Sequence, residues 1–366
     1  GVQTCALPIC HTLSDPDNPV RGIGAARRWF AAELSKIGDQ CNCIEVANIA
    51  RTFTGDRAPR GVEIVDVLGF QAGSDPKRVV IIMGHIDSRV TDVMNATADA
   101  PGANDDGSGT ALVLEAARIL SKHKFRATIV YAALSGEEQG LFGGQLLAET
   151  AKERGWTVTA VLNNDIVGNT IGTDGRKVAD RVRIFSETFS EGDTPAALKD
   201  LLADGGEDDG RSRALAKAID QVAGTIPGGL DALLVRRPDR YGRGGDHTPF
   251  LKLGYPAVRF TVGIENYDAQ HQDLLPGKGD TVDKMDFAYL AKVTALNIAT
   301  ARRLASAPAA PEKVTLGGAV SSDTSVKWTA VPGAAKYRVH WRRADAQDWT
   351  DHVDIRSEEH TSELQS

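Results

Sequence analysis

The chain has 366 residues, of which 42% are apolar and 25% are charged, and its formal net charge at pH 7 is −7. This composition is typical of a globular protein with one large domain and a smaller unit. A negative chain without a basic run is a poor match for nucleic acid or an anionic membrane, so we expect neither as a partner and no membrane insertion.

Both ends of the chain are expected to be translated adapter sequence. Residues 356–366 (RSEEHTSELQS) can be written in codons as a sequencing-library adapter, and the reverse complement of that adapter encodes residues 1–9 (GVQTCALPI). Both segments are therefore left out of the fold prediction. The absence of a leader peptide then carries no information about cellular location.

Strands and helices alternate over residues 10–305. Helices are expected at residues 22–38, 108–121, 141–154, 195–202, 212–222 and 287–305, from apolar residues at helical spacing. Strands are expected at residues 62–70, 79–83, 127–134, 158–163, 182–185 and 256–262. Because these strands are continuously apolar, the pattern predicts an α/β sheet that is covered by helices on both faces.

The cysteines outside the adapter segments are Cys10, Cys41 and Cys43. A C-x-C pair with one remote cysteine does not match a zinc knuckle. Closely spaced bridges are rare, so we favour free or buried thiols over a disulfide.

The C-terminal part differs in character from the rest. Residues 306–311 (SAPAAP) are expected to be a linker, and residues 312–355 alternate apolar and polar positions. The second segment resembles the front half of a fibronectin type III domain. It is too short for a complete two-sheet sandwich of about 100 residues, so we expect a truncated, partial all-β sandwich with exposed apolar strands.

Acidic residues and a histidine recur where apolar segments end. They are His85 and Asp87 after residues 79–83, Asp105 in a glycine-rich loop, Glu137 and Glu138 after residues 127–134, and Asp165 after residues 158–163. Open α/β sheets build their sites at the carboxyl ends of strands, so these side chains are expected at one edge. Neutral imidazoles and carboxylates bind zinc, so the set predicts a hydrolase with two adjacent zinc ions.

Individual roles follow from position. Asp87 lies on the same side of an extended chain as His85 and can hold its imidazole. Residues 102–109 (GANDDGSG) would repel phosphate and lack a Walker lysine, so Asp105 is the candidate bridging ligand, while Ser108 is expected to cap the next helix. Of two adjacent glutamates, one can coordinate metal while the other acts as a base on a metal-activated water.

With these residues in place, the chain resembles the di-zinc exopeptidase family of bacterial leucyl aminopeptidases, which has glutamate carboxypeptidase and glutaminyl cyclase relatives. The resemblance covers about residues 22–305. It is carried by the H-x-D motif at His85, the G-x-N-D-x-G-S-G loop at residues 102–109, the double glutamate, the N-x-D-M-x-G motif at residues 163–168 with Ile166 in place of methionine, and the D-H-x-x-F motif from Asp246 to Phe250.

The resemblance implies a mixed, mostly parallel central sheet and two Zn²⁺ per chain. One zinc would be held by His85, Asp105 and Asp165, and the other by Asp105, Glu138 and His271. Glu137 would be the general base, and Glu137 and Asp87 the catalytic residues. His271 is favoured over His247, which with Asp246 precedes a predicted helix and can cap it. The motif around His271 departs from the family's Tyr-His-Thr context. The family also implies a secreted or periplasmic location.

The function expected from the resemblance is hydrolysis of the N-terminal peptide bond of peptides, by a monomer. Alternatives are a carboxypeptidase, a glutaminyl cyclase, or a non-catalytic peptide-binding protein on the same scaffold, which would lack metal-ligating residues. A carboxypeptidase needs a cation for the substrate carboxylate, for which the sequence offers Arg236, Arg237, Arg240 and Arg243. We interpret these arginines as a solvated basic face.

Overall fold

The computed structural model describes residues 10–189, 193–203, 206–318, 320, 323–343, 346 and 349–356, and the backbone of residues 361–365. The predicted adapter segment at residues 1–9 lies outside the described residues, as do residues 357–360 and 366 of the other one. The chain divides after Ser306 into a large unit and a small C-terminal unit. In the described part of the chain, no helix combines the length and the apolar character needed to span a bilayer.

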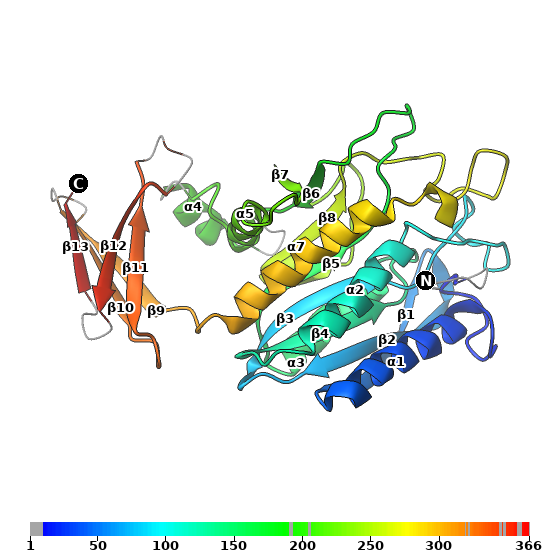
Figure 1. The fold of residues 1–366 in the computed structure, drawn as a ribbon, viewed down its shortest axis with the longest axis horizontal. Helices are drawn as coiled ribbons and strands as arrows, with labels where there is room; N and C mark the ends of the chain where they lie inside the picture. The colour runs from blue at the N-terminus through cyan, green and yellow to red at the C-terminus, as the bar shows by residue number, and fades with distance from the viewer. Residues whose placement is uncertain are drawn as a thin grey trace. The chain divides into compact units, whose positions relative to one another are not determined.

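The large unit is built on an eight-stranded sheet in the order β1-β2-β4-β3-β5-β8-β6-β7 (Figure 1). Its strands are β1 (Ile44–Gly55), β2 (Ala58–Gln71), β3 (Asp75–His85), β4 (Ala127–Leu134), β5 (Thr157–Asn164), β6 (Arg181–Phe185), β7 (Asp231–Val235) and β8 (Ala257–Val262). Strands β4, β3, β5 and β8 run parallel, as do β6 and β7, whereas the β1–β2, β2–β4 and β6–β8 pairs are antiparallel. The prediction of a mixed, mostly parallel sheet is confirmed.

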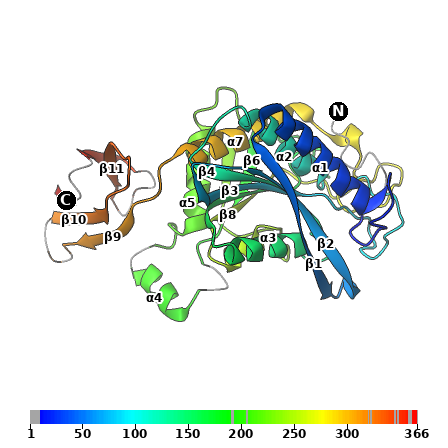
Figure 2. The ribbon, with the colours of Figure 1, turned by 90° about the horizontal axis from the view of Figure 1, so that it is seen from below.

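Helices cover both faces of this sheet, as predicted (Figure 2). The helices of the large unit are α1 (Gly22–Cys41), α2 (Gly107–Leu120), α3 (Phe142–Glu153), α4 (Pro195–Ala203), α5 (Arg211–Ala223), α6 (Thr248–Lys252) and α7 (Phe287–Ser306), with a 3₁₀ turn at Val282–Lys284. Helix α4 buries none of its residues and does not contribute to the covering layers. Successive residues of β3 point to opposite faces. Val80 and Ile82 pack in a core with α1, α2, α5 and α7, whereas Val79 and Ile81 pack in a second core with α3 and α6.

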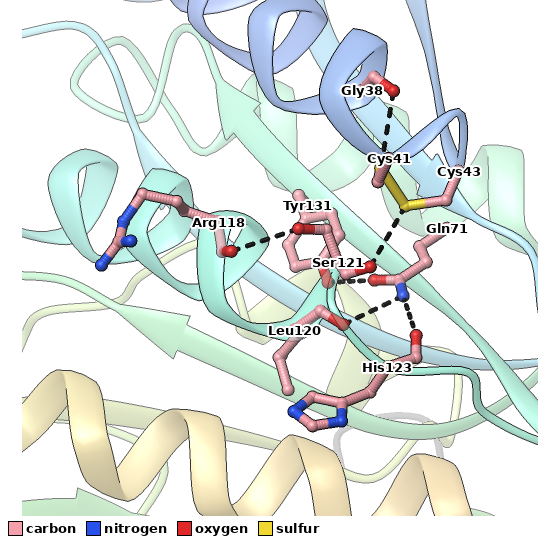
Figure 3. Close-up of a disulfide and its surroundings, with 9 residues drawn as sticks. All are labelled: Gly38, Cys41, Cys43, Gln71, Arg118, Leu120, Ser121, His123 and Tyr131. Atoms are coloured by element: carbon pink, nitrogen blue, oxygen red, sulfur yellow. Dashed lines mark hydrogen bonds between the residues drawn. A yellow bond between two sulfur atoms is a disulfide. The ribbon is translucent and has the colours of Figure 1, made fainter.

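The interpretation of Cys41 and Cys43 as free thiols is wrong, because they form a disulfide beside the end of α2 (Figure 3). Asn42 ends α1 in the left-handed conformation (φ 49°), which turns the chain so that both side chains lie on one side. The resulting Cα–Cα distance of 5.1 Å is within the range that disulfides need. Cys43 Sγ lies 3.4 Å from the carbonyl oxygen of Ser121.

The C-terminal unit contains two small antiparallel sheets. One has the order β13-β10-β9, with β9 at Glu312–Gly317, β10 at Asp323–Thr329 and β13 at Thr361–Gln365, and the other pairs β11 (Lys336–Trp341) with β12 (Asp351–Arg356). Val326, Trp328 and Ile355 form its buried core. Val314 and Leu316 on β9 are 55% and 76% exposed, in line with the expected exposed apolar strands. The fibronectin type III resemblance stays a prediction.

Candidate metal centre

The sheet topology brings the ends of three parallel strands together. His85 is the last residue of β3, and its register partner on β4 is Leu134, three residues before Glu137. On the other side, β5 ends at Asn164, immediately before Asp165. Because β4, β3 and β5 are parallel neighbours, these polar side chains lie at the same edge of the sheet.

Asp105 reaches this edge from the loop before α2. The carboxylate of Asp280 accepts hydrogen bonds from the backbone N–H groups of Asn104 (2.9 Å) and Asp105 (2.7 Å), which fixes the loop. Asp106 is the N-cap of α2 and accepts from the N–H of Gly109 at 2.9 Å. The expectation that Ser108 caps this helix is therefore wrong. The helix begins one residue earlier, and the Ser108 hydroxyl donates to the carbonyl oxygen of Asn104.

The first ligand group surrounds the imidazole of His85. Its Nε2 lies 3.2 Å from Asp105 Oδ1 and 3.9 Å from Asp165 Oδ1. One ligand atom each from His85, Glu137 and Asp165 lie within 4.8 Å of one another. His85 Nδ1 lies 2.9 Å from the main-chain carbonyl oxygen of Asp87, which only accepts hydrogen bonds, so the ring carries its hydrogen on Nδ1. The lone pair of Nε2 is then directed at the carboxylates.

The second ligand group joins Asp105, Glu138 and His271, whose ligand atoms lie within 4.8 Å of one another. His271 Nε2 is 2.8 Å from Asp105 Oδ2 and 3.0 Å from Glu138 Oε1. Asp105 thus faces one histidine with each of its two carboxylate oxygens. His247 joins neither group, because its Nε2 lies 2.7 Å from the carbonyl oxygen of Pro238. It also makes no side-chain bond that would cap α6.

Three buried atoms at this edge have no hydrogen bond of adequate geometry: His85 Nε2, Asp105 Oδ2 and Glu138 Oε1. His85 Nε2 faces oxygens of Asp105 and Asp165, and the other two atoms face His271 Nε2. Buried polar atoms are almost always satisfied, and an imidazole nitrogen beside carboxylate oxygens is a donor set that zinc prefers. The residues present therefore fit divalent zinc.

Asp87 holds the main chain of Glu137 and Glu138 in place through hydrogen bonds. Its carboxylate accepts from the N–H groups of Glu137 (3.3 Å) and Glu138 (3.2 Å) and from the hydroxyl of Thr12 (2.6 Å). The expected contact between the Asp87 carboxylate and the His85 imidazole is long, at 3.6 Å. Burial, followed by the charges of Glu138 and Asp165, raises the pKa of Glu137 well above its usual range, against the opposing effect of His85.

Two arginines that the sequence did not indicate contact the ligands. Arg259 on β8 is 1% exposed, and its guanidinium lies 2.9 Å from Asp165 Oδ1 and 2.7 Å from Asp239 Oδ2. Burial alone would raise the pKa of Asp165, but the charge of Arg259 together with His85 lowers it. Arg89 lies 2.9 Å from Glu138 Oε2 and 2.6 Å from His271 Nδ1.

The prediction that the four arginines from Arg236 to Arg243 form a solvated basic face is wrong for Arg240. Arg240 has a side chain that is 12% exposed and is paired with Asp239 and Glu265, next to Arg259. Arg236, Arg237 and Arg243 are exposed, as expected.

A sheet whose strand ends carry two groups of zinc-type side chains, with Asp105 facing a histidine of each, is typical of a metal-dependent hydrolase of the α/β class. The chain belongs to peptidase family M28, whose sequence profile matches residues 66–301. The resemblance to zinc exopeptidases drawn from the motifs is thereby confirmed.

Individual relatives agree with this family. A protein of Leptosphaeria maculans named a probable zinc metalloprotease is 42% identical over 360 residues, which cover 94% of this chain and 82% of that protein. The LapA aminopeptidase of Legionella pneumophila has a similar fold, with a TM-score of 0.57 at 20% identity over 83% of this chain and 69% of its own. A glutaminyl cyclase of Porphyromonas gingivalis matches with a TM-score of 0.52 at 18% identity over 76% of this chain and 88% of its own.

Proposed function

We propose that this protein is a zinc-dependent aminopeptidase that hydrolyses the N-terminal peptide bond of peptide substrates. The observation that carries the proposal is the position of Asp105 between His85 Nε2 and His271 Nε2, at 3.2 Å and 2.8 Å. A carboxylate placed this way has the geometry of a bridge between two cations. It supports a centre of two Zn²⁺ per chain.

His85, Asp105 and Asp165 would hold one zinc ion, and Asp105, Glu138 and His271 the other. Bound zinc would polarise the scissile carbonyl and lower the pKa of a water molecule at the site. Glu137 also lies close enough to His85 and Asp165 to reach the first ion. We assign Glu137 as the base and not as a ligand, because carboxylate oxygens of Asp105 and Asp165 already face His85 Nε2 at the first group.

Glu137 is the residue we assign to proton transfer. Its main chain is held by the Asp87 carboxylate, and its raised pKa suits a group that takes a proton from water and returns it to the leaving amine. Asp87 acts through this contact and is a positioning residue.

The aminopeptidase assignment is supported over a carboxypeptidase by Arg240, the member of the arginine group that is largely buried. A carboxypeptidase needs a free cation for the substrate carboxylate, whereas Arg240 is already paired with two acids. The similar fold of a protein named an aminopeptidase supports the same choice. We propose that the enzyme acts as a monomer.

The test is release of a chromogenic amine from amino-acid anilides by zinc-loaded protein. A free α-amine is expected to be required, so an N-acetylated anilide should not be cleaved. Glu137→Gln is expected to lower kcat by about a hundredfold or more while the zinc content stays unchanged. Full activity of Glu137→Gln would overturn the assignment of the base, and cleavage of the blocked substrate would overturn the aminopeptidase assignment.

We also propose that the protein is exported, to the periplasm or the medium. The Cys41–Cys43 disulfide supports this, because disulfides persist in oxidising compartments. The domain boundaries that we propose are a peptidase domain at residues 10–305, a linker at residues 306–311 and a fibronectin type III-like segment at residues 312–355.

A further inference from the structure

Arg89 contacts both ligands that complete the second group. Its Nε lies 2.9 Å from Glu138 Oε2, and its Nη2 lies 2.6 Å from His271 Nδ1. The side chain is 15% exposed, and Glu138 is the acid with which it pairs among the described residues. The positively charged guanidinium of Arg89 thus already contacts two of the side chains that would hold the second zinc ion.

The contact with His271 fixes which ring nitrogen can accept. A guanidinium has only donors, so His271 Nδ1 must accept the hydrogen bond from Arg89. The hydrogen of a neutral ring is then on Nε2, which is the nitrogen that faces Asp105 and Glu138. A neutral imidazole that binds metal through Nε2 carries its hydrogen on Nδ1, where it would point at the Arg89 donor.

His85 has the opposite arrangement in the first group. Its Nδ1 faces a carbonyl oxygen at 2.9 Å, so the hydrogen is on Nδ1 and the lone pair on Nε2 is available to a metal. The first group is therefore preorganised for zinc, and the second is preorganised for Arg89.

Charge acts in the same direction as the hydrogen bonds. Arg89 neutralises part of the negative charge of Glu138 and would repel a nearby cation. Arg259 at the first group differs, because it is also paired with Asp239, which offsets its charge.

We propose that Arg89 competes with the metal ion at the second ligand group, so that this group binds zinc weakly until the guanidinium is displaced. Arg89 cannot keep its contact with His271 Nδ1 when a zinc ion is bound by Asp105, Glu138 and His271. The proposal rests on the two-zinc part of the proposed function and is independent of which peptide bond is cleaved.

The test is calorimetric titration of the metal-stripped 366-residue protein with zinc, compared with Arg89→Met. The variant is expected to bind the second zinc about tenfold more tightly or more, with the first affinity unchanged, because a unit charge and a competing donor are removed. Arg89→Gln is expected to act in the same way, which keeps the test intact if one variant folds poorly.

Arg57→Met is the matched control. Arg57 is exposed and donates to the main-chain oxygen of Glu138 at 2.9 Å, but it contacts no ligand atom. Its removal should leave both zinc affinities unchanged. Unchanged or weaker binding of the second zinc in both Arg89 variants would overturn the proposal, since an arginine that merely orients the ligands gives that result. The proposal would also be overturned if Arg57→Met bound the second zinc more tightly by the same factor as the Arg89 variants. Zinc affinity and anilide cleavage are separate readouts, so failure of this proposal is distinguishable from failure of the aminopeptidase assignment.

Discussion

Replacement of Arg259 by methionine tests how the charged network supports the centre. The Arg259 side chain is 1% exposed and is paired with Asp165 at 2.9 Å and Asp239 at 2.7 Å, both almost fully buried. Methionine fills similar space but leaves both carboxylates without this cation. Removing one partner of a buried ion pair costs about 3–5 kcal/mol, a large share of a typical free energy of unfolding of about 5–15 kcal/mol.

The measurement is urea and thermal unfolding of the metal-free protein, followed by circular dichroism. Arg259→Met is expected to lose about 3–5 kcal/mol and to melt roughly 10 °C lower. Zinc should stabilise the variant more than the wild type, because a metal ion replaces the missing charge beside Asp165. Arg181→Met removes an arginine whose side chain is 41% exposed and is paired with Asp180 at 2.8 Å, and no measurable change is expected. A loss below about 1 kcal/mol in Arg259→Met would refute the reasoning.

Three further variants test neighbouring contacts. Burial raises the pKa of Asp280 to about 7. Between about pH 4 and about pH 7, the Asp280 side chain therefore binds more protons in the folded metal-free protein than in the unfolded chain. Its contribution to the free energy of unfolding falls as the pH rises through that range. Asp280→Asn should show a smaller fall in urea titrations, and an equal fall would contradict the assignment. Thr12→Val removes the 2.6 Å hydrogen bond to Asp87 and should cost about 1–3 kcal/mol in the same assay; a neutral change would show that Asp87 does not need it. Cys43→Ser opens a short loop and should cost only about 1–2 kcal/mol; a much larger loss would indicate a wider role for the disulfide.

The elements that the sequence predicts well are those marked by a long, continuous run of apolar residues. Continuously apolar strands such as β3 and β4 are buried on both faces and were expected. Strand β1 is absent from the prediction because it lies at the sheet edge, where nearly all of its residues are exposed or half exposed, and no continuous apolar run marks it. Strand β7 is also absent from the prediction, because its apolar run is only four residues long and follows a loop at the opposite edge of the sheet.

At the centre, the residues that follow strands can be predicted from chain order alone, and His271 is predicted through the family resemblance. The residues that support them from far along the chain, Arg259 and Asp280, cannot be predicted in either way. Asp165 directly follows an apolar strand, which makes it visible in the sequence. Arg259 pairs with that aspartate across 94 positions, and Asp280 meets the N–H of Asn104 across 176 positions. The charged Arg259 within the apolar strand AVRFTV was the available signal, because a buried charge needs a partner. Arg89, two residues after Asp87, carried no such signal.

Anomalous diffraction at the zinc edge from crystals grown with saturating zinc tests the central claim most directly. Two peaks are expected within about 4 Å of each other, one beside His85 and Asp165 and the other beside Glu138 and His271, with the Asp105 carboxylate between them. In the electron density of the same crystals, the Arg89 side chain should have left His271. No zinc peak at these residues, or a pair of peaks that Asp105 does not bridge, would contradict the account.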